Sequence, residues 1–342
     1  MAFSKVILND ETLMDVTGNT SDTDNMLYGV LGTRSSGTSA TGQVTLSNSN
    51  LLRNWYFAGS GGGVGEFPVN QRGLTSYTGS GFTIDGWYAR NSMTVGVQSD
   101  GIHLNFPSGS TTLKGLNQTF TTLRNYLVGK TVTLSVIIKD FVSFGSTTYP
   151  RFGLYSGASA GVHSSAILTD VITGNGLFSI TGQIRDTVLN YSNLNFTACY
   201  ANSYSGSLTV VAAKMELGTQ QTLAHLENGQ WIINEIPNYW DELSKCQRYL
   251  KQVTNWSDLY TARSDTSNLY FFIPGATMAR VPDTVTSKQV YFYAGSNYYT
   301  ITDDITFTNQ YGGIRGTMPK GNIPNNSGGT LTFASAFYIS AE

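Results

Sequence analysis

Few side chains in this sequence have the types and spacings that catalysis or metal binding requires. The three histidines, His103, His163 and His225, lie far apart, and none has a second histidine at the spacing of a metal site. No HExxH or phosphate-loop motif occurs, and the glycine-rich run at residues 61–65 is not followed by Lys-Ser or Lys-Thr. The sequence therefore indicates no catalytic residues, no metal ligands and no cofactor of these kinds.

Carboxylates are the remaining groups that could do chemistry, because a glycosidase needs two of them roughly 5–10 Å apart. The candidates are Asp85, Asp100, Asp140, Asp170, Asp186 and Glu216. The sequence alone brings no pair of them together. The repeats typical of a long β-helix, the usual architecture of a polysaccharide depolymerase, are not visible either. We expect a protein that is not an enzyme, with hydrolysis kept as an alternative.

Aromatic side chains are far more abundant, with 20 Tyr, 17 Phe and 5 Trp. Sugars stack their C–H faces on such rings and form hydrogen bonds with amide and guanidinium groups. In a strand, Trp87 and Tyr88 must point to opposite faces, so a buried Trp87 leaves Tyr88 outward. Arg90 and Asn91 follow directly. We expect these three residues, Tyr88, Arg90 and Asn91, to form a first glycan-binding surface.

A second aromatic group lies near the end of the sequence. It consists of Tyr291, Tyr293, Tyr298 and Tyr299, with Tyr311 and Arg315 in a glycine-rich stretch. Surfaces rich in Tyr, Ser, Gly and Asn recognise ligands at a low entropic cost. This group is our second candidate glycan-binding surface. The alternative is that these rings pack within sheets or between protomers.

The overall composition excludes several other classes of partner. Charged residues make up 12% of the sequence and the net charge is −2, with Lys and Arg scattered, so no cationic cluster suited to nucleic acid is present. No apolar run approaches the roughly 20 residues that span a bilayer. The first residues lack the long apolar stretch of a secretory signal. Two cysteines, Cys199 and Cys246, cannot form a disulfide framework, and we expect both to be buried.

Alternating apolar residues predict many short strands, including 102–106, 131–141, 194–201 and 207–217. The residues expected to face the core in the last two are Leu194, Phe196, Ala198 and Tyr200, and Val211, Ala213, Met215 and Leu217. Helical spacing of apolar residues predicts one helix over 237–253. Aromatic strands resume after it and end in a strand over 330–340.

These elements predict an all-β fold: a jelly-roll sandwich plus a smaller C-terminal β-sandwich, with one connecting helix. The expected domains are an N-terminal segment and linker (1–48), the jelly roll (49–220), a linker and helix (221–253), and a C-terminal β head (254–342).

Several stretches carry a resemblance to phage and prophage tail proteins. NLLRNWYFAG (50–59) with FTIDGWYA (82–89) resembles the opening of their carbohydrate-binding-module-like jelly rolls, and AAKMELGTQQTLA (212–224) the closing strand of that module. DELSKCQRYL (241–250) resembles the helix that precedes a C-terminal β head in tail fibres, and IPGATMARVP (273–282) approximates a signature of that head. The run at 11–32 resembles small tail-attachment segments.

The resemblance implies a homotrimeric phage tail fibre or receptor-binding protein, located in the virion and extracellular after lysis. Its expected partners are bacterial cell-surface polysaccharide and other tail or baseplate proteins. The distal head usually meets the host in such fibres, which favours the C-terminal tyrosines. Related modules often hold a structural calcium, for which Glu216 is the candidate ligand here. A structural tail or baseplate component and a capsule depolymerase are the alternatives.

Overall fold

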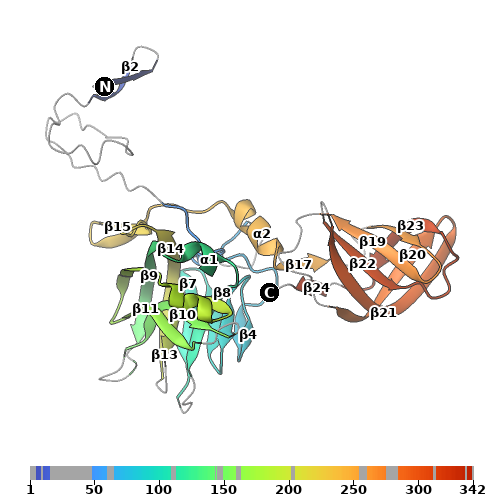
Figure 1. The fold of residues 1–342 in the computed structure, drawn as a ribbon, viewed down its shortest axis with the longest axis horizontal. Coiled ribbons are helices and arrows are strands. Elements are labelled where there is room, and N and C mark those ends of the chain that lie inside the picture. Colours follow the sequence, from blue (N-terminus) through green and yellow to red (C-terminus); the bar gives the residue numbers. More distant parts are fainter. Residues whose placement is uncertain are drawn as a thin grey trace.

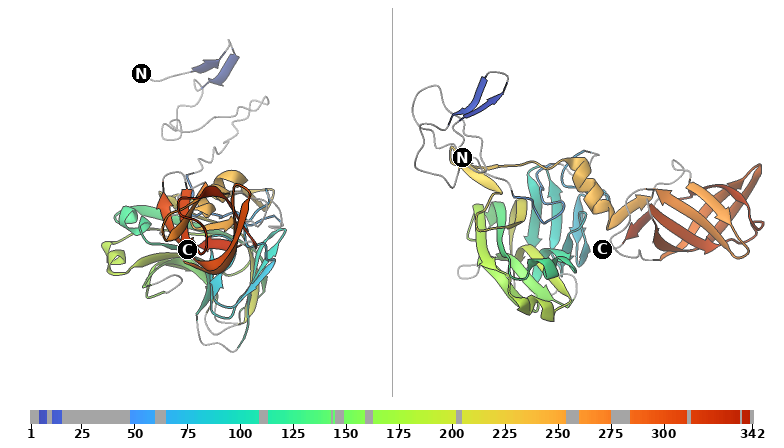
Figure 2. Two further views of the ribbon diagram at one scale, coloured as in Figure 1. Left: turned by 90° about the vertical axis from the view of Figure 1, so that its right-hand side faces the viewer. Right: turned by 45° about the horizontal axis from the view of Figure 1, so that its top comes forward.

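The structure is a computed structural model. It describes residues 5–8, 11–15, 48–59, 65–108, 113–142, 144, 149–158, 163–201, 205–253, 260–274, 284–310, 313–335 and 337–340. Figure 1 shows two β regions on either side of helix α2 (Tyr239–Gln247), and Figure 2 shows the same arrangement from two other sides. The predicted all-β class with one main connecting helix is confirmed. Most of the segment 1–48 lies outside the described residues, apart from strand β1 (Lys5–Leu8) paired with β2 (Glu11–Asp15).

The first β region is a sandwich of two antiparallel six-stranded sheets. One sheet, named here the β8 sheet, has the strand order β11 (Ser165–Val171), β10 (Arg151–Gly157), β13 (Asn193–Ala201), β8 (Lys114–Phe120), β5 (Tyr88–Arg90) and β4 (Gly81–Phe82). The other, the β9 sheet, has the order β12 (Gly176–Gln183), β9 (Thr131–Val142), β14 (Gly206–Leu217), β7 (Gly101–Phe106), β6 (Thr94–Gln98) and β3 (Ser76–Thr78). Two short helical turns, α1 (Leu123–Leu127) and η1 (Asp186–Asn190), lie between strands.

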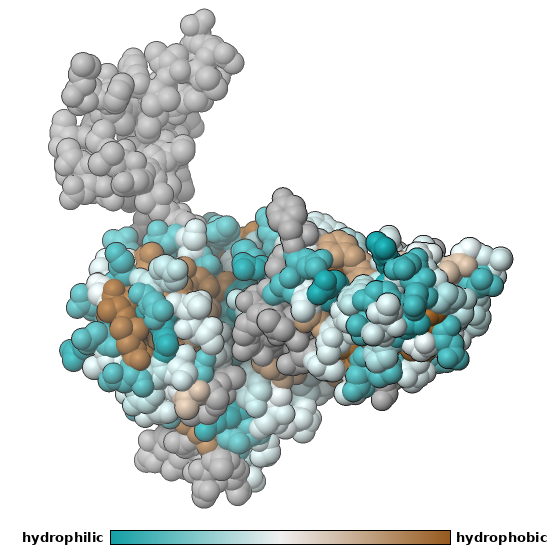
Figure 3. Space-filling model, turned by 45° about the vertical axis from the view of Figure 1, so that its right-hand side comes forward, coloured by the Kyte–Doolittle hydropathy of each residue, from teal (hydrophilic) through white to brown (hydrophobic). Residues whose placement is uncertain are grey.

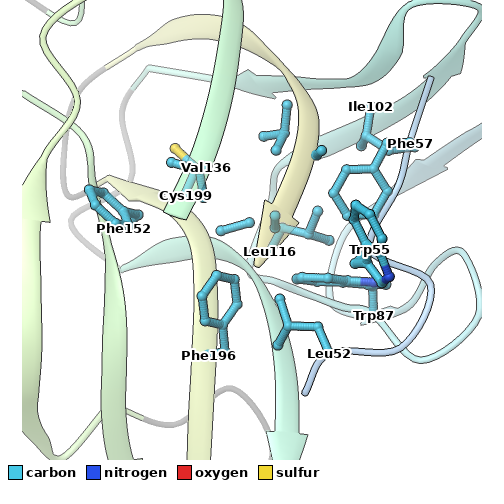
Figure 4. Close-up of a cluster of buried hydrophobic side chains, with 14 of the residues drawn as sticks. Leu52, Trp55, Phe57, Trp87, Ile102, Leu116, Val136, Phe152, Phe196 and Cys199 are labelled. Atoms are coloured by element: carbon cyan, nitrogen blue, oxygen red, sulfur yellow. The ribbon is translucent and has the colours of Figure 1, made fainter. Parts of the chain in front are cut away.

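The core of the sandwich follows the predicted alternation. In β9, Val132, Leu134, Val136 and Ile138 are at most 1% exposed, and β7 buries Ile102, Leu104 and Phe106 completely. Side chains from both sheets and from the segment before β3 meet in one cluster, part of which Figure 4 shows. Burial of this continuous apolar layer is the main force that holds the two sheets together.

The structure corrects the predicted face of Tyr200 in β13. The register with β8 shifts between Thr197 and Cys199, which marks a β-bulge. A bulge inserts one residue and reverses the alternation beyond it. Cys199 therefore enters the core, where it is labelled in Figure 4, and Tyr200 points away from the core against Tyr155. Leu217, predicted to be buried, lies at the end of β14 and is 47% exposed.

The predicted helix at 237–253 is shorter in the structure. It begins after Asn238, whose side-chain oxygen accepts hydrogen bonds from the N–H groups of Trp240 and Asp241, and it ends at Gln247. Residues Leu250–Val253 form strand β17, which pairs with β24 (Phe337–Ser340). Leu250 and Val253 are buried in this ladder. Their apolar side chains fitted the helical spacing, but they are apolar because they are buried in a strand. Between the sandwich and α2 lies a hairpin of β15 (Ala224–Glu227) and β16 (Gln230–Ile233).

The second β region is all-β, as expected, but its six strands close into one barrel where a sandwich was predicted. Its strand order is β18 (Tyr260–Ser264), β19 (Asn268–Pro274), β22 (Gly313–Pro319), β21 (Asn297–Gln310), β20 (Val285–Ala294) and β23 (Gly328–Phe333). The predicted single strand at 330–340 is divided, because Phe333 ends a barrel strand whereas Phe337 begins β24. A second hydrophobic cluster fills the barrel. No helix in the described ranges is long and apolar enough to cross a membrane.

Asn54 is a polar hub inside the sandwich. It is fully buried, and its side chain donates to the carbonyls of Val69 (2.8 Å) and Asp85 (2.9 Å) and accepts from the Val69 N–H (2.8 Å). Its own carbonyl accepts from the Trp87 indole (2.8 Å), and its N–H donates to Glu242 of α2 (2.6 Å). Asn54 therefore joins the first segment, the β4–β5 turn and the helix at one point.

A second set of contacts joins α2 and the β17–β24 ladder to the sandwich. The Gln71 side-chain amide donates to the carbonyl of Leu250 (2.8 Å), and the Tyr338 hydroxyl donates to the carbonyl of Gln71 (2.9 Å). Phe67, Val69 and Cys246 form a small hydrophobic cluster beside these bonds. Both cysteines are free and buried, as predicted.

We predict that Asn54→Ala lowers the free energy of unfolding by about 3 kcal/mol, because it leaves several buried polar groups without partners. Urea unfolding followed by tryptophan fluorescence measures this. Asn228→Ala is the matched control, because Asn228 is exposed and has the same positive φ of 49°. In the control, the free energy of unfolding should fall by only about 1 kcal/mol, because alanine tolerates a positive φ less well than asparagine does. Equal losses in the two variants would contradict the role assigned to Asn54.

Candidate functional site

A cleft of about 740 Å³ is bordered by the β8 sheet, by the segment before β3 and by the C-terminal end of α2. The residues that line it are Asn50, Leu51, Leu52, Arg53, Phe82, Gly86, Tyr88, Asn117, Thr119, Phe120, Thr121, Thr122, Leu123, Ala158, Asn193, Lys245, Arg248 and Tyr249. They include residues of the two opening jelly-roll stretches (50–59 and 82–89) and of the helix motif (241–250), and none of the closing strand. A concave site of this size with mixed aromatic and polar lining is the usual form of a small-ligand site.

Tyr88 provides an aromatic face to the cleft. Trp87 is fully buried and Tyr88 is half-buried on the other side of β5, as strand alternation predicts. The ring of Phe82, on the neighbouring strand, packs edge-on against Tyr88 with centroids 5.3 Å apart. Opposite Tyr88 in the ladder lies Asn117 of β8. The Tyr88 ring is therefore held in place while part of it stays accessible.

Arg53 and Tyr249 also line the cleft. The Arg53 guanidinium lies over the Tyr249 ring, 3.8 Å from its centroid, and its side chain passes close over Gly86. A Cβ at position 86 would lie 2.5 Å from Arg53 Nε, so this packing requires glycine there. Gln118 holds the Arg53 backbone through two hydrogen bonds of 2.9 Å. The guanidinium is thus fixed by contacts on two sides.

A buried polar network supports the β8 sheet behind the cleft. Asn117 Oδ1 accepts from the hydroxyl of Thr197 (2.6 Å) and lies 2.8 Å from His163 Nε2, while the Asn117 amide donates to the carbonyl of Gly115 (3.0 Å). Because Oδ1 can only accept, His163 carries its proton on Nε2. The His163 ring stacks on Tyr155 with centroids 4.1 Å apart. Burial, and secondly the positive charge of Arg90, lower the pKa of His163 from 6.5 to about 3.

Arg90 and Asn91 do not line the cleft. Arg90 ends β5, close enough to His163 for its charge to act on the imidazole. Asn91 has a positive φ of 60°, and its side-chain amide donates to the carbonyl of Leu113, while its N–H donates to Ser80 Oγ (2.8 Å). Its side chain is thus used to form the turn after β5. Of the first predicted surface, Tyr88 alone lies at the cleft.

The C-terminal tyrosines are divided between two faces of the barrel. Tyr291, Tyr293 and Tyr298 lie together on the outer face of the β20–β21 hairpin, with ring centroids 5.6 and 5.3 Å from Tyr298 to the other two. Tyr298 is 53% exposed. Tyr299 instead packs against the barrel core beside Phe292.

Arg315 is remote from that tyrosine cluster. It lies opposite Thr308 in the ladder, about ten residues along β21 from Tyr298, or roughly 33 Å of extended strand. Its guanidinium lies over the Tyr270 ring, 5.4 Å from the centroid. Tyr311 lies outside the described residues. The second predicted surface therefore reduces to three tyrosines on the outer face of one hairpin.

Two of the carboxylates considered for catalysis or metal binding, Glu216 and Asp85, are buried and hydrogen-bonded within the fold. Glu216 is fully buried, accepts from the Thr222 N–H (2.7 Å) and hydroxyl, and pairs with Lys214 (3.6 Å). The ammonium of Lys214 therefore stands beside the oxygens that calcium would need. Asp85 is buried and accepts from the Gln71 N–H (3.0 Å). Within the described residues, no three His, Cys, Asp or Glu side chains come together as a metal site.

Sequence reasoning missed Arg53, Lys245, Arg248 and Tyr249 as cleft residues. All four belong to motifs that the sequence singled out, NLLRNW and ELSKCQRY, but nothing in the sequence places these two motifs beside each other. The contact that does so, from Asn54 to Glu242, involves a backbone N–H and leaves no signal in residue type.

No family model matches the chain, and no curated protein matches its sequence. Among solved structures, the chain is similar to the N-terminal CBM22-1–CBM22-2 tandem domain of Xyn10C from Paenibacillus barcinonensis. The two are 12% identical, the match covers 78% of this chain and 97% of that chain, and the TM-score is 0.28. At this TM-score the likeness carries no argument about function.

We predict that acid destabilises the protein through His163. The folded state holds the pKa of this residue at about 3, below the unfolded value of 6.5, so protonation favours unfolding. The free energy of unfolding should fall as the pH drops from about 6.5 to about 3, by at most about 1.4 kcal/mol per pH unit. His163→Gln, which retains a donor for Asn117, should flatten this dependence. NMR detection of His163 titrating near pH 6.5 in the folded protein would contradict the assignment.

Proposed function

We propose that this chain is a glycan-binding protein without catalytic activity and that the cleft beside Tyr88 is its sugar site. The observation that carries the proposal is the pairing of aromatic faces with hydrogen-bonding groups in one concave site. Tyr88 and Phe82 offer aromatic rings, and the Tyr249 ring, with the Arg53 guanidinium over it, lines the same cleft. The C–H faces of a sugar can stack on such rings while its hydroxyls reach Thr121, Thr122 and the arginines.

Binding without hydrolysis is favoured by the composition of the lining. A glycosidase needs a carboxylic acid and a carboxylate on either side of the scissile bond. None of the described residues that line the cleft is Asp or Glu. This supports an adhesin over the alternative, a capsule-polysaccharide depolymerase.

We further propose that the protein acts as a receptor-binding protein of a phage tail. It would be part of the virion, attach to bacterial cell-surface polysaccharide, and join other tail or baseplate proteins through its N-terminal segment. The support is the resemblance of motifs in a consistent order along the chain. The structure adds that the jelly-roll motifs and the helix motif meet physically, at Asn54, Trp87 and Glu242. A structural tail component that binds no receptor is the alternative.

We predict that Tyr88→Ala weakens binding to bacterial surface oligosaccharides by about ten-fold, because loss of a stacking ring costs on the order of 1–2 kcal/mol. The measurements are a glycan array and binding to intact bacteria, compared with glycan-stripped cells. Tyr126→Ala is the control, because Tyr126 is 75% exposed on α1 and does not line the cleft. Tyr298→Ala tests the barrel surface in parallel. Failure of the wild-type protein to bind any glycan or host would sink the adhesin proposal.

The proposed homotrimer has its own test. Multi-angle light scattering of the purified protein should give three times the chain mass of 37.1 kDa. The mass should persist on dilution, because trimeric fibres form extensive obligate interfaces. A mass of one chain across the concentration range would rule the trimer out, without bearing on the sugar site.

A further inference from the structure

We infer that the glycan bound in the cleft carries an anionic group, a carboxylate or a phosphate, and that Arg53 and Arg248 bind it. The inference rests on the proposed function, since it names the ligand class of the same cleft. It differs from the expectation that composition alone gives. A chain with few charges suits neutral sugars. Figure 3 shows a surface of mostly hydrophilic or intermediate hydropathy, with separate apolar patches.

The charge of the cleft differs from that of the whole chain. The sequence has 20 Lys and Arg against 22 Asp and Glu. The described lining of the cleft has three cationic residues, Arg53, Lys245 and Arg248, and no acidic residue. Lys245 is neutralised nearby, because its ammonium lies 2.5 Å from Glu242 Oε1. The guanidinium groups of Arg53 and Arg248 therefore give the cleft a net positive charge.

Arg53 is prepared for an anion by its surroundings. The Tyr249 ring and the backbone of Gly86 hold its side chain in one orientation, so little conformational entropy is lost when it binds. Its Nε is buried against Gly86, so the terminal nitrogens of the guanidinium are the ones that can reach a ligand, and no carboxylate among the described residues forms an ion pair with them. A planar guanidinium presented in this way matches the paired oxygens of a carboxylate or phosphate.

Arg248 approaches the same cleft from α2. It is exposed, it caps the C-terminus of the helix, and it forms no ion pair within the described part of the chain. The helix end itself has a partial charge of about −0.5, which is smaller than the two full charges of the arginines. Two like charges on one cleft repel each other, and a bound anion removes that repulsion. The site thus gains more from an anionic sugar than from a neutral one.

The test uses the purified full-length chain and an array of paired oligosaccharides. Each pair contains a neutral member and a version that carries either a uronic acid or a phosphate. We expect anionic members to bind about ten-fold more tightly than their neutral partners. This preference should shrink as sodium chloride rises from about 50 to about 500 mM. The uronic and phosphorylated arms identify which anion the site prefers.

Variants of the arginines locate the effect. Arg248→Gln should weaken binding of anionic members about three-fold more than binding of neutral members, because the glutamine amide still forms hydrogen bonds with sugar hydroxyls but carries no charge. The thermal unfolding midpoint should be retained because the side chain is exposed. Arg53→Gln should act in the same direction, and Arg53→Lys should retain part of the preference, since it keeps the charge but loses the planar fork. Arg185→Gln is the matched control, because Arg185 is exposed and outside the cleft.

The outcomes separate the two proposals. Equal binding of neutral and anionic members, with no effect of Arg248→Gln, overturns the anionic ligand and leaves the glycan site in place. Anionic preference that persists in both arginine variants overturns the assignment of these residues. Absence of binding to every member of the array overturns both the inference and the proposed function.

Discussion

The buried carboxylate of Glu242 is the constraint on which the rest of the arrangement depends. A carboxylate in an apolar interior costs several kcal/mol unless hydrogen bonds and an opposite charge compensate it. Here the Asn54 N–H and the Lys245 ammonium do so, at 2.6 and 2.5 Å. Lys245 lies on α2 itself, so the position at which the helix can dock is set by the reach of Glu242 to the Asn54 N–H. That requirement fixes α2 against the segment that opens the sandwich.

The cleft is a consequence of this docking. Arg53 immediately precedes Asn54, and Arg248 and Tyr249 follow Glu242 by less than two helical turns. When Glu242 meets Asn54, these neighbours are brought together in the lining of one cleft. The positive φ of Asn54 turns the chain so that Arg53 points toward Tyr249 while Trp55 enters the core. Arg53, which lines the cleft, is therefore followed directly by the buried residues Asn54 and Trp55.

The sequence predicted what depends on periodicity and missed what depends on tertiary contacts. Strand β9, its buried face and the outward position of Tyr88 follow from alternation alone. The bulge that turns Tyr200 outward has no signature, because Cys199 and Tyr200 are both apolar enough to be buried. The apolar side chain of Leu250 is compatible with either a helix or a strand. It lies in a strand because the backbone pairs with Ser340 of β24. Tyr88 could be found in advance, whereas the cationic side of the cleft could not, since Arg53 and Arg248 meet only after folding.

The β17–β24 ladder has an evolutionary consequence. Val253 and Phe337 are paired partners, so the chain leaves for the barrel and returns from it at a single point. Everything between those two residues is an insert in one short antiparallel ladder. Recombination that exchanged this insert would replace the whole barrel while leaving the sandwich, the helix and the cleft intact. The fold is thus organised as a fixed scaffold with an exchangeable cassette, and the two aromatic surfaces can diversify independently.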